Sequence, residues 1–487
     1  MQFITFKGYQ NNANTPILIY FDWHAIEWPI ISIRMIYARF LVTLKREFLN
    51  WRLWASRAIV LGYAALAGLT IVGLTKLSEL AFNYFLHYQN QHWWFPVIWT
   101  PLLTILIVFL TRKLVPGAAG SGIPQVIAAL DPQCPPEQRN LFVSLKLTFY
   151  KIILTAGGLL AGLSLGREGP SVQIAAGVMR NARRWLPSVS QISESSLIMA
   201  GGAAGIAAAF NTPLGGIMFA IEELSKSLEQ RSNGLIIASI VLAGLMSISI
   251  EGNNTYFGVL HAGEINLNVI LSSCLVIIVS GILGGLFSKL IIFSLKLRTG
   301  RIGILRTKSP LLFAGACGLL VAFIGILSQG ETYGTGYTHT QAIIADSANT
   351  SYLFVPLKFI ATWLSTLAGV PAGIFAPALA IGAGIGNTIS GILSLPEGQI
   401  LIAIGMAGFL AAVTQAPMTS FIIVMEMVDG HGLVLSLMAS ALIASGISRM
   451  IGKPLYPALA QMQLKRVVKT TADSESTEDI HQKPPHP

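Results

Sequence analysis

Residues 166–170, which read Gly-Arg-Glu-Gly-Pro, are the stretch that decides the fold of this chain. Two loops of the same kind, Gly-Ser-Gly-Ile-Pro at 120–124 and Gly-Ile-Phe-Ala-Pro at 373–377, also open apolar segments. Proline is well tolerated in the first turn of a helix, and glycine lets the backbone come close to a ligand. Because a helix N-terminus carries unpaired N–H groups and a partial positive charge, three converging N-termini would form an anion site built largely from backbone.

The composition indicates a membrane protein. Of the 487 residues, 53% are hydrophobic and 11% are charged, and the mean hydropathy is +0.64, whereas soluble domains carry about 25% charged residues. We expect an all-α polytopic membrane protein with several helices too short to cross alone, because broken helices survive in a bilayer only along a cavity or pathway. Apolar stretches that approach the length of a bilayer span recur at Ala58–Leu74, Val97–Leu110, Ile152–Leu165, Leu235–Ile250, Val269–Phe287 and Leu311–Leu327.

The net charge of +10 comes from Lys and Arg gathered in hydrophilic breaks between the apolar stretches. Such clusters are typical of the cytoplasmic loops of membrane proteins, so we expect no nucleic-acid partner. Three cysteines, Cys134, Cys274 and Cys317, are too few and too scattered for a disulfide framework or a metal site. We expect neither a bound metal nor an organic cofactor.

The chain contains two copies of one plan. Gly202-Ala-Ala-Gly205 is repeated as Gly405-Met-Ala-Gly408, and the loop that ends at Pro170 corresponds to the loop that ends at Pro377. The matches keep their order along the chain, which shared small-residue packing alone would not preserve. Further matching pairs are Gly120 with Gly334, Pro213 with Pro417, and Glu222 with Glu426.

Duplicated halves with an odd number of spans run through the membrane in opposite directions. Inverted-topology repeats of this kind place the substrate near the midplane, between broken helices. We assign residues 55–250 to the first membrane repeat and 251–466 to the second. Residues 1–54 are interpreted as a peripheral segment, and the polar residues 467–487 as a disordered tail.

Glu168 is the first residue that could carry chemistry. A carboxylate inside the membrane is costly and is a functional hypothesis by default. At a helix N-terminus it is attracted to the same donors that would hold an anion, so it can compete with that anion until it is protonated. The alternative is a structural cap paired with Arg167.

Glu222 and Glu223 form a second acidic pair, at the end of the apolar run Phe210–Ile221. Adjacent helical residues point about 100° apart, so we expect at most one of them to face the interior. For this pair a functional role and a surface role stay open.

One further motif, Gly162-Leu-Ser164-Leu-Gly166, fits the nucleophile elbow of serine hydrolases. That elbow needs a preceding strand and a histidine base, and neither is suggested around Ser164. We interpret the motif as part of a helical apolar run. An intramembrane hydrolase remains the second rival class.

Taken together, the three loops and Tyr456 resemble the signature set of the CLC chloride channel and transporter family over residues 55–465. The resemblance implies an all-helical homodimer with one anion pathway per subunit. It implies that a central chloride is bound by the hydroxyls of Ser121 and Tyr456 and the N–H groups of Ile374 and Phe375. Gly120, Arg167 and Gly169 belong to the same anion-binding loops.

The resemblance also assigns the two acids. Glu168 matches the gating glutamate of the family, and Glu223 matches its inner proton-transfer glutamate, which is typical of exchangers. Ser121 favours chloride over nitrate, and the Gly-Arg-Glu-Gly-Pro loop differs from the fluoride-exporting branch. Gln125 stands where many bacterial relatives have glutamate. No counterpart of the CBS domains of eukaryotic members is recognised, which favours a prokaryotic inner-membrane protein.

We therefore predict a proton-coupled chloride antiporter. The nearest rival is a passive, gated chloride channel on the same fold, because two glutamates do not by themselves prove that a proton route joins them.

Overall fold

The computed structural model describes residues 51–187, 190, 192–225, 233–252, 255–260, 267–297, 299–345, 351–393 and 398–465. The chain divides into two units, Met1–Ala55 and Ser56–Pro487, and the contacts reported below belong to the second. The predicted tail at 467–487 lies outside the described residues, as does the predicted peripheral segment up to residue 50.

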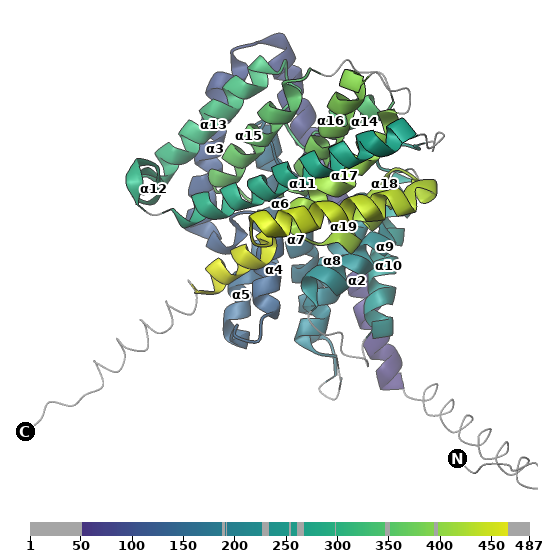
Figure 1. The fold of residues 1–487 in the computed structure, drawn as a ribbon. Helices are drawn as coiled ribbons and strands as arrows, with labels where there is room; N and C mark the ends of the chain where they lie inside the picture. The colour runs from purple at the N-terminus through teal and green to yellow at the C-terminus, as the bar shows by residue number, and fades with distance from the viewer. Residues whose placement is uncertain are drawn as a thin grey trace, which may run out of the picture. The chain divides into compact units, whose positions relative to one another are not determined.

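The described residues are almost entirely helical (Figure 1). The first half contains α2 (Trp51–Gln91), α3 (Phe95–Leu114), α4 (Ile123–Leu130), α5 (Arg139–Phe142), α6 (Leu145–Leu160), α7 (Glu168–Asn181), α8 (Glu194–Phe210), α9 (Pro213–Phe219) and α10 (Asn233–Glu251). The second half contains α11 (Leu267–Lys296), α12 (Gly300–Lys308), α13 (Pro310–Leu327), α14 (Tyr337–Ile344), α15 (Phe354–Leu367), α16 (Phe375–Leu393), α17 (Gly398–Thr414), α18 (Pro417–Met427) and α19 (Val434–Ile451).

Eight of the helices described are long and apolar enough to cross a membrane, and four shorter apolar helices accompany them. The prediction of a polytopic all-α protein with helices too short to span alone is therefore confirmed. Each of the three proline loops opens a helix, namely α4, α7 and α16.

The two-copy plan is confirmed by a reciprocal pair of backbone hydrogen bonds. Gly166 and Gly373 hold equivalent places, each four residues before the proline of its loop. They form an antiparallel bridge in which Gly166 N–H donates to Gly373 O at 2.7 Å and Gly373 N–H donates to Gly166 O at 2.8 Å. Equivalent residues that bond each other reciprocally are related by a local two-fold axis, so α7 and α16 begin side by side and run apart.

Two glutamates repeat this relation at the ends of α9 and α18. Glu222 accepts from Met418 N–H at 3.2 Å and Thr419 N–H at 2.7 Å, at the start of α18. Its counterpart Glu426 accepts from the N–H groups of residues 214 and 215, at the start of α9, at 3.1 and 2.7 Å. Carboxylates satisfy orphan N–H groups and favour the positive end of the helix dipole, so each half caps a helix of the other.

Two buried lysines complete the symmetric scaffold. Lys151 of α6 donates from Nζ to Ala118 O and Gly120 O, at 2.7 Å in both cases. Lys358 of α15 donates to the equivalent carbonyls of residues 332 and 334, at 2.9 and 2.8 Å. Both side chains are fully buried, and each one holds a glycine loop through two hydrogen bonds to its carbonyls.

Close helix packing through small residues surrounds the bridge. α7 packs against α8, and α16 packs against α17, while α11 runs alongside α19 (Figure 1). A Cβ on Gly205 of α8 would lie 2.5 Å from Ser171 O of α7, and one on Gly405 of α17 would lie 2.2 Å from Gly382 O of α16. Only glycine allows these backbones to approach so closely.

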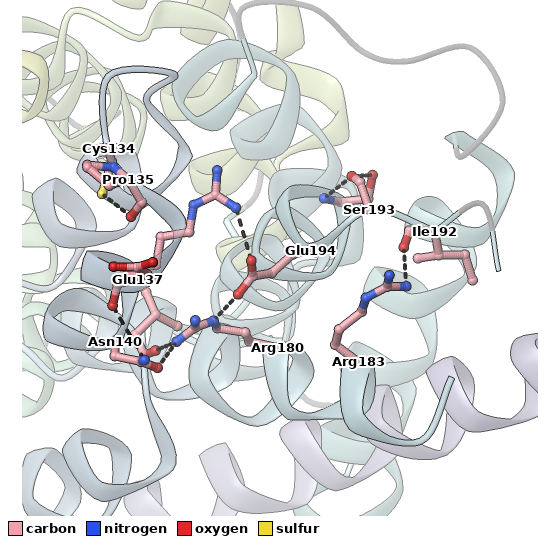
Figure 2. Close-up of polar contacts among 12 residues, drawn as sticks. Cys134, Pro135, Glu137, Asn140, Arg180, Arg183, Ile192, Ser193 and Glu194 are labelled. Atoms are coloured by element: carbon pink, nitrogen blue, oxygen red, sulfur yellow. Dashed lines mark hydrogen bonds and ion pairs between the residues drawn. The ribbon is translucent and has the colours of Figure 1, made fainter. Parts of the chain in front are cut away.

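Some of the basic side chains form ion pairs and hydrogen bonds within the protein (Figure 2). Glu194, the first residue of α8, accepts from Arg180 of α7 and from Arg139 of α5. Arg180 also donates to Asn140 Oδ1 and to Val143 O. This cluster ties the segment after α4 to the far ends of α7 and α8.

One local prediction is wrong. The run Ile152–Leu165 does not stay helical, because α6 ends at Leu160 and Gly162 has a positive φ of 73°. Residues 161–165 therefore form an irregular segment that carries the chain to the bridge at Gly166. The ring of Phe85 lies against Gly162, where a Cβ would be 2.1 Å from it.

Candidate functional site

The three glycine–proline loops come together at one place. Besides the Gly166–Gly373 bridge, Gly120 N–H donates to Val370 O at 3.2 Å, and Ala372 N–H donates to Gly120 O at 3.1 Å. Main-chain bonds thus join the loop before α16 to the loops before α4 and α7. The predicted convergence of the loops is confirmed.

Glycine is required where the loops touch. A Cβ on Gly169 would lie 2.3 Å from Ser121 Oγ and 3.2 Å from Gly373 Cα. A Cβ on Gly122, where φ is 110°, would lie 2.5 Å from Gly169 O. Ser121 is therefore held directly against the first turn of α7.

Gln125 fixes the shape of the serine loop. Its Oε1 accepts from Gly122 N–H at 2.9 Å, and its Nε2 donates to Ala119 O at 2.6 Å. The side chain is buried and bonds to its own loop. Gln125 therefore stabilises the loop that carries Ser121.

Among the described residues, the buried polar atoms of these loops that have no hydrogen-bond partner include Ser121 Oγ, Glu168 Oε1 and Arg167 Nε, and Tyr456 Oη also has none. A buried polar atom left unpaired costs about 1–3 kcal/mol. Tyr456 is 1% exposed, lies beside Ser121, and interacts electrostatically with Glu223 and Glu168. Two unpaired hydroxyls beside helix N-termini are the donor set that a small anion needs.

Glu168 reaches across from α7 to the start of α16. Its Oε2 accepts from Ala376 N–H at 3.4 Å and lies so close to Gly166 that a Cβ there would be 2.2 Å away. Ile374 and Phe375, the predicted backbone ligands, directly precede Ala376 and are buried. The carboxylate thus uses the same N-terminus that would bind the anion.

Arg167 turns away from these loops. Its guanidinium donates to Thr75 O at 3.3 Å, to Glu79 Oε1 at 3.2 Å and to Tyr256 Oη at 3.5 Å. Its ion pair is therefore with Glu79 of α2 and not with the neighbouring Glu168. The alternative interpretation of the sequence is that Glu168 is a structural cap paired with Arg167. The side chains do not show this pair.

Glu222 and Glu223 lie in a π-helical turn, Ala220–Leu224, that follows α9. The carboxylate of Glu222 is committed to the start of α18, and both glutamates line a cavity of about 240 Å³. The cavity is further bounded by residues after α4, between α17 and α18, and after α19: Asp131, Ser225, Thr414, Gln415, Ala416, Pro454, Pro457 and Gln461 among them. Tyr456 directly precedes Pro457 of the cavity wall and interacts electrostatically with both Glu223 and Glu168.

Sequence reasoning missed four residues that shape the site: Lys151, Lys358, Glu79 and Tyr256. The lysines could have been found, because both stand in apolar runs 207 residues apart, the same spacing as Pro170 and Pro377. A carboxylate inside the apolar run of α2 was a comparable signal for Glu79. Tyr256 gave no signal, since it lies in a connecting segment.

Ser164 does not form a nucleophile elbow. The helix α6 precedes it, where the elbow needs a strand, in the part of the chain that the structure describes. Its Oγ lies 2.9 Å from Thr362 Oγ1, and its N–H donates to Ser365 Oγ at 3.1 Å. These bonds attach Ser164 to two residues of α15.

Comparisons with known proteins agree with this geometry. Residues 103–449 match the family model described as voltage gated chloride channel. The chain is 32% identical over 443 residues to the H(+)/Cl(-) exchange transporter ClcA of Klebsiella pneumoniae, covering 84% of this chain and 89% of the relative.

Two solved structures share the fold. A slow cyanobacterial Cl-/H+ antiporter matches with a TM-score of 0.72 and 23% identity, and a CLC-type fluoride/proton antiporter matches with a TM-score of 0.70 and 21% identity. Each comparison covers 84% of this chain and 98% of the other. The all-helical architecture with two inverted repeats is that of these proteins.

Substituting Gly169 by alanine tests whether the loops form an anion site. The added Cβ would meet Ser121 Oγ at 2.3 Å and Ser121 O at 2.8 Å, so the serine must move away. We expect halide affinity to fall by about tenfold or more, which corresponds to about 1.4 kcal/mol. Isothermal titration of the purified protein with chloride measures it. Gly157→Ala, whose Cβ has 3.5 Å of room, is the control, and equal affinity in both variants would contradict the assignment.

Proposed function

The chain belongs to the voltage gated chloride channel family, and from this premise we propose that it is a multi-pass membrane protein that exchanges chloride for protons. The observation that carries the proposal is the carboxylate of Glu168 at the N-terminus of α16, beside two unpaired hydroxyls. A second acid, the half-buried Glu223, lines a separate cavity. One acid competes with the anion, and the other can pass a proton to it.

The competition at α16 couples the two ions. A deprotonated Glu168 accepts from the first turn of α16, so it excludes a halide from the same N–H groups. Protonation removes its charge and its attraction to the helix dipole. The side chain can then leave, and chloride takes the place of the carboxylate. The departure of the proton with the return of the carboxylate expels the anion.

In this mechanism the site residues have separate roles. The hydroxyl groups of Ser121 and Tyr456 donate hydrogen bonds to chloride, and so do the backbone N–H groups of Ile374 and Phe375. Gly120 and Gly169 permit the close approach of the loops, as the contacts at Ser121 support. Arg167 contributes positive charge near the path. It does not contact the anion, because its guanidinium is bonded to Glu79 of α2.

The relative of 32% identity is named as an exchanger, which favours antiport over a passive channel on the same fold. One of the matching structures is of a fluoride/proton antiporter, so the choice of anion has to be argued. We propose chloride rather than fluoride because two hydroxyls and a Gly-Arg-Glu-Gly-Pro loop form the site. A homodimer in the plasma membrane of a prokaryote is proposed as the assembly. Large apolar side chains exposed on α9, α10, α18 and α19 support a partner or lipid there: Leu214, Leu245, Met418, Leu435 and Leu442.

The reversal potential distinguishes exchanger from channel. In vesicles that contain the purified protein, a pH gradient at fixed chloride should shift the reversal potential of an exchanger. A channel would follow the chloride gradient alone. A reversal potential that does not move with pH would reject proton exchange and leave the channel as the better account.

Glu168→Ala should abolish the coupling and leave anion flux intact. Without the carboxylate nothing competes with chloride at the start of α16, and nothing carries the proton there. The reversal potential of this variant should no longer respond to pH, while chloride efflux continues. Retained proton transport would move the role of the gating acid to another residue.

Glu223→Gln should stop proton movement and preserve chloride conduction, because glutamine fills the same place in the cavity wall without titrating. Removal of a general acid–base group typically costs about 100-fold or more in proton transfer. Simultaneous recordings of pH and chloride in a vesicle suspension measure the two fluxes. An unchanged ratio of the fluxes would show that the proton takes another route.

A further inference from the structure

We propose that Glu79 is a positioning residue that holds the charge of Arg167 on the α2 side of α7, so that Arg167 cannot lock the neighbouring Glu168 in an ion pair. The inference rests on the proposed role of Glu168 as the carboxylate that leaves and re-enters the anion site. It concerns the residue that keeps this movement free.

The contacts of Arg167 all lie on one side. Its Nη1 atom donates to Thr75 O and Glu79 Oε1, both on α2, and its Nη2 atom donates to Tyr256 Oη. The side chain of Arg167 is 9% exposed, and that of Glu79 is 49% exposed. Among these acceptors only Glu79 carries a full negative charge, and a charged acceptor makes the stronger bond.

Tyr256 is held firmly enough to serve as the third acceptor. Its ring lies 5.5 Å from the ring of Phe210 and 4.8 Å from that of Tyr337. The next residue, Phe257, donates its N–H to Met427 O at 2.9 Å. The guanidinium therefore rests between α2 and a segment that is anchored to the end of α18.

An ion pair between Arg167 and Glu168 would otherwise be favourable. Arg167 Nε and Glu168 Oε1 are both buried, and neither has a hydrogen-bond partner. The two residues are neighbours in the chain, and unpaired charges attract strongly where water is excluded. A carboxylate bound in this way would be harder to protonate and slower to yield its place to chloride.

Other titratable groups also face this pair. Glu251 at the end of α10, Tyr256, and Tyr337 at the start of α14 interact electrostatically with Arg167, Tyr456 interacts with Glu168, and Lys76 on α2 interacts with Glu251. Glu251 lies 4.0 Å from Lys76 and interacts electrostatically with Arg167, but its Oε1 has no hydrogen-bond partner. It supplies a matched control: a nearby negative charge that does not hold the guanidinium in place.

The test uses Glu79→Gln and the control Glu251→Gln, each in the native chain and in the Glu168→Ala background. Chloride efflux from vesicles is recorded against pH. Glu79→Gln should move the pH of half-maximal flux down by about one unit, since a paired Glu168 needs more acid to be protonated. In the Glu168→Ala background the same substitution should change the flux less than about twofold, because no carboxylate remains to be locked.

Three outcomes would overturn the proposal. Equal slowing of flux with and without Glu168 would mean that Glu79 only stabilises the fold. Equal shifts from Glu79→Gln and Glu251→Gln would reduce the effect to local charge. No shift at all would show that Thr75 and Tyr256 hold Arg167 unaided.

Tyr256→Phe is the second variant, needed if Glu79→Gln does not elute as the native protein on size exclusion. It removes one acceptor of Arg167 and should give a smaller shift in the same direction, again only when Glu168 is present. Failure of the proposed exchange would appear separately, as a reversal potential that ignores pH. The flux assay does not depend on it, because chloride flux through a gated channel would report the same shift.

Discussion

A bilayer leaves no water to satisfy a broken helix, so every interrupted backbone must find its hydrogen bonds within the protein. The bridge between Gly166 and Gly373 meets this requirement at the place where α7 and α16 both start. Lys151 and Lys358 donate hydrogen bonds to the carbonyls of the glycine loops. Glu426 and Glu222 accept hydrogen bonds from the N–H groups at the starts of α9 and α18. The unpaired hydroxyls of Ser121 and Tyr456 beside the loops then stand out as positions for a ligand.

The scaffold is symmetric, but its chemistry is not. Ser121 of the first half keeps an unpaired hydroxyl, whereas the hydroxyl of the equivalent Thr335 accepts from Tyr337 N–H at 3.1 Å, at the start of α14. The counterpart of Glu223 in the second half is Met427, which is apolar and buried. Symmetric bonds therefore build the fold, and these departures from symmetry lie at two of the residues for which we propose a role in binding or moving ions.

The repeat, the broken helices and the convergence of the loops could be predicted from glycine and proline spacing, because those residues act through local backbone geometry. The run Ile152–Leu165 misled, since apolar side chains fit an irregular buried segment as well as a helix, and only the position of Phe85 against Gly162 shows the break. The direction of Arg167 could not be predicted either. It is decided by Glu79 and Tyr256, which are far from it in the sequence and reach it only through the packing of α2 and the segment after α10.

The two charged dipeptides of the proposed transport path share one arrangement, in which the first residue is bonded and the second is not fixed in the same way. In Arg167-Glu168, the arginine is bonded to α2 and Tyr256, while Glu168 keeps one oxygen unpaired. In Glu222-Glu223, the first carboxylate accepts from two N–H groups at the start of α18, while the second lines the cavity. A neighbour fixed by strong bonds sets the local backbone, and the adjacent side chain stays able to change partner or protonation state. Since a carboxylate that is already satisfied has little reason to move, the ability of this protein to couple two ions depends on which member of each pair is left free.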